Sequence, residues 1–225
     1  MTRLIVVRHG HSTANKKAVF AGHFDVPLTE IGKKQARFVA DYLCAHEKID
    51  KILCSDLTRT KQTAAALARR LGLPVHADTS LREVFAGLWE TMPFKEINQI
   101  YHKDWMNWRF CFAQARPTGG ESIREHYFRI TSAVHRIAQE NDGKTVVLFT
   151  HCTPVRVIRA MSMGLSPERV DEAEFPLNAS LAIYCYESGT LYAERTNLIV
   201  YPISCSTRPG CPHPPLVADE KGLSC

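Results

Sequence analysis

Short apolar runs alternate along the chain with longer stretches in which apolar residues recur at helical spacing. Three of the runs, residues 4–7, 51–54 and 145–149, contain β-branched residues and show no clean alternation of polar and apolar positions. Runs of this kind are typical of parallel strands that are buried on both faces of a sheet. We therefore predict three such strands.

The stretches between the runs predict helices. Thr29 is a suitable N-cap for the first helix, and Gly72 is a stop signal for the second. The predicted helices cover residues 29–43, 57–71 and 122–141, and a fourth follows Pro154 and ends at Gly164.

Residues 181–186 and 191–194 flank the turn sequence Glu-Ser-Gly-Thr, which predicts a hairpin at a sheet edge. Strands that alternate with helices are typical of α/β proteins. The expected fold is a three-layer α/β sandwich, with a mostly parallel central sheet and helices on both faces.

The segment 84–120 is rich in aromatic residues and contains no strong strand pattern. We interpret it as a helical excursion over the edge of the sheet, and two roles are open for it. It is either a lid-like region in which residues such as Trp89 and Phe94 contact an organic substrate, or a hydrophobic subcore.

The chain has 225 residues, of which 45% are hydrophobic, and this length suits one sizeable core. We assign residues 1–202 to a single domain. Prolines cluster after residue 202, and residues 203–225 are expected to form a flexible tail. Cysteines 205, 211 and 225 and His213 match no closed zinc-ligand spacing, so no metal site is predicted.

The formal net charge is +5, but no basic block interleaved with aromatic residues is present, which disfavours a nucleic-acid partner. The longest apolar runs are far shorter than the roughly 20 residues that cross a bilayer, so no membrane partner is expected. The start of the chain lacks the pattern of a secretory signal, and the expected location is cytoplasmic. The cysteines before the tail are then expected to be reduced thiols.

Polar residues follow each predicted parallel strand at its carboxyl end. Arg8 and His9 follow the first strand, Arg59 lies in the first turn of the helix after the second strand, and His151 follows the third. Because ligands bind beyond the carboxyl ends of parallel strands, we expect these four side chains to meet at one edge of the sheet.

This combination of residues suits phosphoryl chemistry. The planar guanidinium groups of Arg8 and Arg59 can each bind two phosphate oxygens, and the helix N-terminus near Arg59 would add backbone donors. Nearby positive charge disfavours an imidazolium, so His9 is expected to remain neutral and to serve as a nucleophile.

Residues 8–15 read Arg-His-Gly-His-Ser-Thr-Ala-Asn. This string resembles the Arg-His-Gly-x-Ser/Thr-x-x-Asn signature of the histidine phosphatase superfamily, in its phosphoglycerate-mutase-like branch. The resemblance continues in the family's order through residues 20–32, 55–64, 81–83, 119–122 and 150–151. It extends over about residues 3–200 and implies the α/β sandwich that the strand pattern also predicts.

The resemblance implies roles for the matching residues. His9 would become phosphorylated, and Glu83 would donate a proton to the leaving alcohol. The transferring phosphoryl group would be held by Arg8, Arg59 and His151. Further phosphate or substrate contacts are implied for Asn15, Gly22, His23 and Cys152. No metal or other cofactor is implied, because arginines and histidines supply the charge stabilisation.

One position departs from the family's pattern. The family usually has glycine after the second catalytic histidine, whereas this chain has Cys152. A larger side chain there would crowd the pocket or reshape its backbone donors.

The implied activity is that of a phosphatase that hydrolyses a phosphate monoester of a small organic metabolite through a covalent phosphohistidine. The chain resembles alpha-ribazole phosphatases and broad-specificity phosphatases in this respect. Glu83 is followed by Val-Phe-Ala-Gly-Leu-Trp-Glu rather than by the Tyr-Gly of phosphoglycerate-type mutases, which favours hydrolysis over that alternative. A non-catalytic phosphate-binding module is a further alternative, and a homodimer is left open.

Overall fold

The computed structural model describes residues 1–205, and its centre is a six-stranded sheet of order β3-β2-β4-β1-β5-β6. The strands β3, β2, β4 and β1 are parallel, and β5 pairs antiparallel with both β1 and β6. The strands are β1 Thr2–Arg8, β2 Lys51–Cys54, β3 Val75–Ala77, β4 Thr145–Thr150, β5 Leu181–Glu187 and β6 Thr190–Leu198. The three predicted central strands and the edge hairpin are confirmed.

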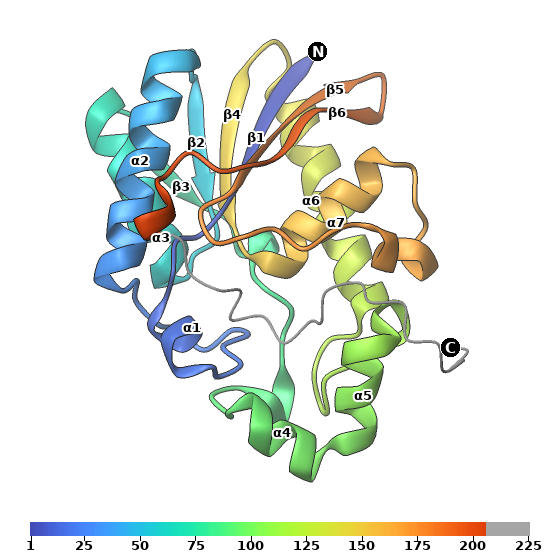
Figure 1. The fold of residues 1–225 in the computed structure, drawn as a ribbon. Coiled ribbons are helices and arrows are strands. Elements are labelled where there is room, and N and C mark those ends of the chain that lie inside the picture. Colours follow the sequence, from blue (N-terminus) through green and yellow to red (C-terminus); the bar gives the residue numbers. More distant parts are fainter. Residues whose placement is uncertain (206–225) are drawn as a thin grey trace.

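Helices cover both faces of the sheet, as Figure 1 shows. Helices α2 (Glu30–His46) and α3 (Thr58–Leu71) pack on one face, and α6 (Ile123–Glu140) and α7 (Cys152–Ser162) pack on the other. This arrangement confirms the predicted three-layer sandwich. The shorter helices are α1 Thr13–Lys17, α4 Phe94–Ile100 and α5 His102–Phe110, with 3-10 turns at Thr79–Leu81, Gly87–Trp89, Phe112–Gln114, Pro167–Glu172 and Ile203–Cys205.

Two elements are missing from the sequence prediction, and one helix begins earlier than predicted. Strand β3 has three residues and helix α1 has five, so neither carries a readable apolar period. Helix α7 starts at Cys152 and not after Pro154. Proline is tolerated in the first turn of a helix, where its missing N–H has no intrahelical partner to lose.

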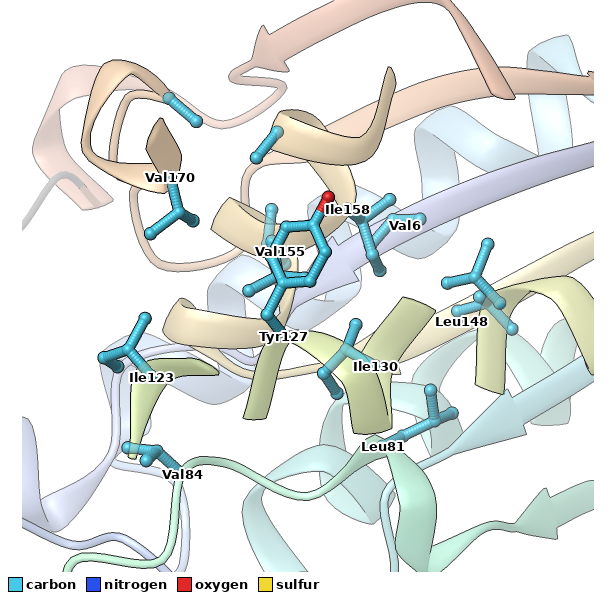
Figure 2. Packing of buried hydrophobic residues seen from close by; sticks show 14 of the residues in the cluster. Val6, Leu81, Val84, Ile123, Tyr127, Ile130, Leu148, Val155, Ile158 and Val170 are labelled. Atoms are coloured by element: carbon cyan, nitrogen blue, oxygen red, sulfur yellow. The ribbon is translucent and has the colours of Figure 1, made fainter. Parts of the chain in front are cut away.

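The central strand β1 is buried on both faces, as its unbroken apolar run indicates. Leu4 and Val6 belong to the hydrophobic cluster beneath α6 and α7, part of which is seen in Figure 2. Ile5 and Val7 belong to the cluster beneath α2 and α3. Because successive side chains of a strand point to opposite faces, β1 serves both cores at once.

The aromatic segment 84–120 is a helical excursion, as predicted, and most of its aromatic residues form a subcore. Trp89, Trp105 and Trp108 are buried together with Phe112. Trp89 is fully buried, which supports the subcore interpretation for this residue, whereas Phe94 is half-buried. The expectation of a reduced thiol is wrong at Cys111, which is disulfide-bonded.

The chain is described as far as Cys205. Ile203–Cys205 form a 3-10 turn, and the side chain of Gln35 on α2 donates a hydrogen bond to the carbonyl oxygen of Cys205 over 2.8 Å. The rest of the expected tail, from residue 206 onward, lies outside the described residues. Within residues 1–205, no helix is both long and apolar enough to cross a membrane.

The loop after β1 crosses helix α2 at very short range. A Cβ atom on Gly10 would lie 2.6 Å from the carbonyl oxygen of Gly32, and one on Gly32 would lie 2.1 Å from the carbonyl oxygen of His11. Neither contact is sterically possible without movement of the backbone. The two glycines therefore fix the loop that follows His9 against the first turn of α2.

We expect the substitution Gly32→Ala to destabilise the fold by about 1–3 kcal/mol, the usual cost of overpacking. An alanine in an exposed helix would instead stabilise the protein relative to glycine. Denaturant unfolding measures the difference, with Lys34→Ala at an exposed position of the same helix as the control. A Gly32→Ala variant as stable as the parent chain would contradict the proposed close crossing.

Candidate active site

His9 and His151 are neighbours because β1 and β4 pair in parallel. Arg8 lies opposite Thr150 in the register, and the N–H of His9 donates to the carbonyl oxygen of Thr150 over 2.9 Å. The two imidazole rings have centroids 5.3 Å apart and meet edge to face at 67°. Both side chains are buried, so the strand ends deliver two imidazoles to one enclosed place.

The ring of His9 is held in one tautomer. Its Nδ1 lies 2.7 Å from the carbonyl oxygen of Gly10. Since a carbonyl oxygen can only accept, Nδ1 carries the hydrogen and Nε2 carries the lone pair. Burial, followed by the charges of Arg59 and Arg8, lowers the pKa of His9 well below its ordinary value of 6.5. The imidazole is therefore neutral at physiological pH.

The ring of His151 has the opposite tautomer. Arg59 donates from Nε to Nδ1 of His151 over 3.1 Å, so Nδ1 accepts and Nε2 carries the hydrogen. That Nε2 is buried and has no hydrogen-bond partner among residues 1–205. Burial, followed by the charges of Arg59 and His9, lowers the pKa of His151 well below 6.5. His151 is thus a neutral imidazole whose Nε2–H can donate a hydrogen bond to a bound ligand.

Arg8 and Arg59 hold positive charge in the interior through neutral acceptors alone. Arg8 donates from Nη1 to the carbonyl oxygen of Pro176 over 2.7 Å, and its buried Nε has no partner in the described part of the chain. Arg59 donates from Nη1 and Nη2 to the carbonyl oxygens of Phe24 and Gly22, over 3.1 and 2.7 Å. Burial lowers the pKa of Arg59 to about 10, which leaves the group charged at neutral pH.

Glu83 caps the N-terminus of helix α7. Its carboxylate accepts from the backbone N–H of Cys152 over 3.1 Å and from that of Thr153 over 3.2 Å. The N–H of Val84 donates to the same carboxylate over 3.0 Å. Because α7 begins directly after His151, this cap places the carboxylate beside the two histidines.

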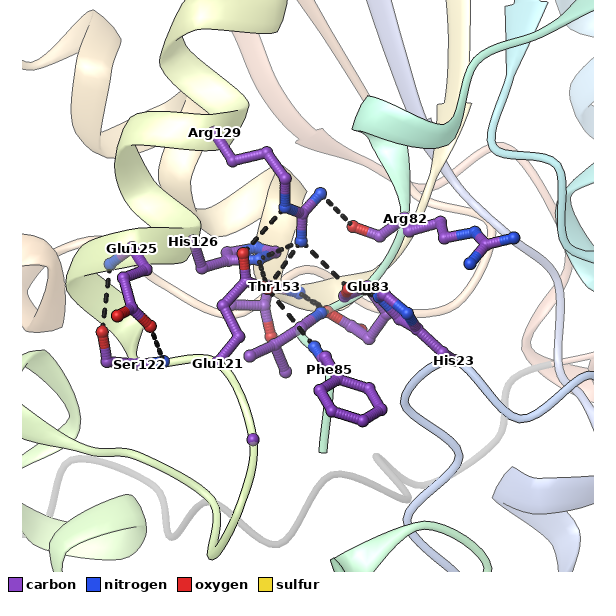
Figure 3. Close-up of polar contacts among 12 residues, drawn as sticks. His23, Arg82, Glu83, Phe85, Glu121, Ser122, Glu125, His126, Arg129 and Thr153 are labelled. Carbon is purple, nitrogen blue, oxygen red and sulfur yellow. Dashed lines mark hydrogen bonds and ion pairs between the residues drawn. The ribbon is translucent and has the colours of Figure 1, made fainter. Parts of the chain in front are cut away.

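The backbone of Glu83 is held by a second set of side chains, drawn in Figure 3. Arg129 of α6 donates to the carbonyl oxygens of Arg82 and Glu83, each over 3.1 Å. His23 donates from Nε2 to the same carbonyl oxygen of Glu83 over 2.9 Å. The carboxylate of Glu121 accepts from Nε and Nη2 of Arg129 over 2.8 and 2.7 Å. Burial raises the pKa of Glu121, but hydrogen bonds from Arg129 and His126 outweigh burial and lower it.

One pocket collects nearly all of the residues that the sequence singles out. It encloses about 540 Å³, including its open mouth. The predicted site residues that line it are Arg8, His9, Asn15, Gly22, Arg59, Glu83 and Cys152. His151 is fully buried beside His9 and does not itself line the pocket. His23 also does not line it, and its ring positions Glu83 as described above.

One predicted feature differs from expectation. The N-terminus of α3 near Arg59 is closed by Asp25, whose carboxylate accepts from the N–H and hydroxyl of Thr58 over 2.7 and 2.6 Å. Cys152 contributes its backbone N–H to Glu83, and its side chain borders the pocket. The helix termini at this edge thus bind carboxylates of the protein itself.

Sequence reasoning missed several residues that shape the site. Asn178 donates to the carbonyl oxygen of His9 and to Oδ1 of Asn15, each over 3.2 Å. Asn15 in turn accepts from the backbone and hydroxyl of Ser12, so its amide oxygen is fully used. Asn178 lies in an irregular loop and Arg129 in a regular helix, and neither position carries a local motif. Asn178 is marked by its burial, and Arg129 by the hydrogen bonds that it donates to the loop of Glu83.

No group of three histidine, cysteine, aspartate or glutamate side chains within residues 1–205 is arranged to hold a metal ion. The tail residues Cys211, His213 and Cys225 fall outside that range. The positive charges among the described residues that line the pocket are those of Arg8 and Arg59.

Comparisons with known proteins agree with this geometry. Phosphoglycerate mutase-like protein 4 of Arabidopsis thaliana is 32% identical over 80% of this chain and 78% of its own length. Phosphoserine phosphatase 1 of Hydrogenobacter thermophilus is 32% identical over 73% of this chain and 78% of its own. A mycobacterial glucosyl-3-phosphoglycerate phosphatase, solved as a complex with VO3, superposes with a TM-score of 0.80 and 28% identity over 87% of this chain and 98% of the other.

A family model places these likenesses in one group. The model of the histidine phosphatase superfamily (branch 1) matches residues 4–199, which is nearly the whole of the described chain. The matched range includes the ends of β1 and β4 and the loop that carries Glu83, and it confirms the resemblance that the motifs indicate. The chain belongs to the histidine phosphatase superfamily, branch 1.

Proposed function

We propose that this chain is a phosphatase that hydrolyses small phosphate monoesters through a covalent phosphohistidine on His9. One observation carries the proposal. Within residues 1–205, the two buried guanidinium groups of Arg8 and Arg59 donate hydrogen bonds only to neutral acceptors. Two buried donors, Nε of Arg8 and Nε2 of His151, have no hydrogen-bond partner in the described part of the chain. Buried donors and buried charge are costly unless satisfied, and a phosphoryl dianion satisfies both.

The transferring phosphoryl group fits between these donors. Arg8 offers Nε–H, His151 offers Nε2–H, and Arg59 supplies a fixed positive charge. The amide nitrogen of Asn15 has no hydrogen bond within residues 1–205, and it borders the same pocket as a further donor. Donors that are fixed before the reaction stabilise the charge that develops on the phosphoryl oxygens.

In the first step, the lone pair on Nε2 of His9 attacks phosphorus. The bond between phosphorus and the ester oxygen breaks, and its electron pair stays on that oxygen. Protonated Glu83 gives its proton to the departing alcohol. The products of this step are the free alcohol, a phosphorylated His9 and the Glu83 carboxylate.

In the second step, a water molecule attacks phosphorus. The Glu83 carboxylate takes one proton of the water, and the bond between nitrogen and phosphorus breaks with its electron pair returned to Nε2 of His9. Inorganic phosphate leaves, and both side chains regain their starting states. The hydrogen bond from Nδ1 of His9 to Gly10 persists throughout and keeps Nε2 directed at phosphorus.

The relatives support a small metabolite as the substrate. Their names include phosphoserine phosphatase, adenosylcobalamin/alpha-ribazole phosphatase and glucosyl-3-phosphoglycerate phosphatase. Phosphomutase activity is the alternative, since one relative is named for its likeness to phosphoglycerate mutase. Incubation with 3-phosphoglycerate separates the two, because a mutase returns the isomer and a phosphatase releases phosphate.

We expect His9→Ala to lower phosphate release by about 10³-fold or more, because the covalent route requires this nitrogen. The direct test is to trap acid-labile phosphate on the protein with p-nitrophenyl phosphate labelled on phosphorus. The matched control is His11→Asn, since the ring of His11 binds Thr29 and does not line the pocket. Labelled protein in the His9→Ala sample would refute the assignment of the nucleophile.

We expect Glu83→Gln to slow the hydrolysis of alkyl phosphates by about 10²–10⁴-fold, which is the usual contribution of a general acid. The same variant should slow the hydrolysis of p-nitrophenyl phosphate far less, because an acidic phenol can leave as its anion and needs no proton from a general acid. Comparison of kcat for the two esters measures this, with Glu96→Gln on the exposed side of α4 as the control. Equal losses for both esters would show that Glu83 does not protonate the leaving group.

The neutral state of His9 predicts how stability depends on pH. Its pKa is lowered in the folded protein and close to 6.5 in the unfolded chain, so below pH 6.5 the unfolded state binds the extra proton. The free energy of unfolding is therefore expected to fall as the pH drops from 7 to 5, by up to about 1.4 kcal/mol per pH unit for each such histidine. His9→Gln should show a shallower slope than the parent chain, and exposed His76→Gln should not. Parallel slopes for all three proteins would contradict the buried neutral imidazole.

A further inference from the structure

Part of the pocket has no role in the proposed chemistry. Besides the residues that hold or transfer the phosphoryl group, the pocket is lined mainly by uncharged apolar side chains. These are Ala14, Val19, Phe20, Ala21, Phe94 and Trp108, which we call the apolar wall. A substrate whose phosphate lies against His9 must place its alcohol portion against this surface.

Ring contacts and backbone hydrogen bonds connect the residues of the apolar wall to one another. The ring of Phe20 meets those of Trp108 and Phe94 edge to face, at centroid distances of 5.2 and 6.2 Å. The backbone N–H of Phe20 donates to the carbonyl oxygen of Met92 over 2.9 Å, and that of Phe94 donates to Ala18 over 3.2 Å. The loop after α1 and the start of α4 therefore hold each other in place. The wall presents a fixed shape to the substrate.

Within residues 1–205, the apolar wall itself contains no cationic side chain that could pair with a second acidic group. Arg8 and Arg59 are the only cationic side chains among the described residues that line the pocket. Both are needed for the phosphoryl group. Arg116 pairs with Glu125 over 2.7 Å, and Arg129 pairs with Glu121 over 2.7 Å.

Arg109 also lies away from the pocket. Its guanidinium lies 5.9 Å from the ring centroid of Trp105 and 5.7 Å from that of Phe110, and it does not line the cavity. A carboxylate on the substrate would consequently lose water against apolar side chains and gain no counter-ion. Burial of an unpaired charge is among the most unfavourable events in a binding site.

We infer that the substrate is a monophosphate ester whose alcohol portion carries no second anionic group and presents a compact aromatic or aliphatic surface to the apolar wall. This inference rests on the proposed function. It sets the chain apart from the Hydrogenobacter relative, since phosphoserine, in that protein's name, bears a carboxylate.

The test compares two esters that differ by one charge, phenyl phosphate and 4-carboxyphenyl phosphate. We expect kcat/KM to be about tenfold or more higher for phenyl phosphate. The carboxylated phenol is the better leaving group, so chemistry alone would give the opposite order. Equal values, or a preference for the carboxylated ester, would overturn the inference while leaving the proposed function intact. If phosphate is released from neither ester, both the inference and the proposed function fail.

A matched pair of variants tests the cause. Val19→Arg adds a cation to the apolar wall and should reduce the preference for phenyl phosphate by about tenfold, because the carboxylate then gains a partner. Ile100→Arg adds the same charge on helix α4 at a position that is 63% exposed and outside the pocket, and it should leave the ratio unchanged. If both variants change the ratio equally, overall charge and not the wall sets the preference, and the inference fails.

Discussion

The parallel pairing of β1 with β4 is the constraint on which the site depends. It aligns Arg8 with Thr150, so that the next residues along both strands, His9 and His151, emerge side by side. The sequence separation between them is large, and only the sheet register brings them together. Both strands are buried on both faces, so every side chain along them is packed in one of the two cores, and a shift along the strand would disrupt that packing.

Burial of charge follows from this arrangement. Arg59 donates to His151 and to two backbone carbonyls, and Arg8 to a third, so the interior holds two cations without a bound carboxylate in the described structure. The same two cations and the same burial keep His9 unprotonated. The proposed nucleophile and the proposed phosphoryl site therefore share the same two cations.

Patterns local in the sequence predicted the fold and the groups closest to the chemistry. The apolar runs located the central strands, and the residues directly after them located Arg8, His9 and His151. Residues that reach the site through contacts between distant elements could not be predicted from such local patterns. Arg129 reaches Glu83 from a helix 46 residues further along the chain, and nothing in its neighbourhood marks it. Trp89 appears in sequence as a candidate substrate contact, yet it is fully buried in the subcore.

The crossing of Gly10 and Gly32 has a consequence for how this sequence can change over time. Each glycine leaves room for the backbone next to the other, and a Cβ on either would collide with that backbone. A later compensating change elsewhere would have to move the loop, and the loop follows directly on His9, the proposed nucleophile. A substitution at one of these glycines cannot therefore be compensated by a later substitution at the other. The two positions, 22 residues apart, are expected to be retained together with the neighbouring His9.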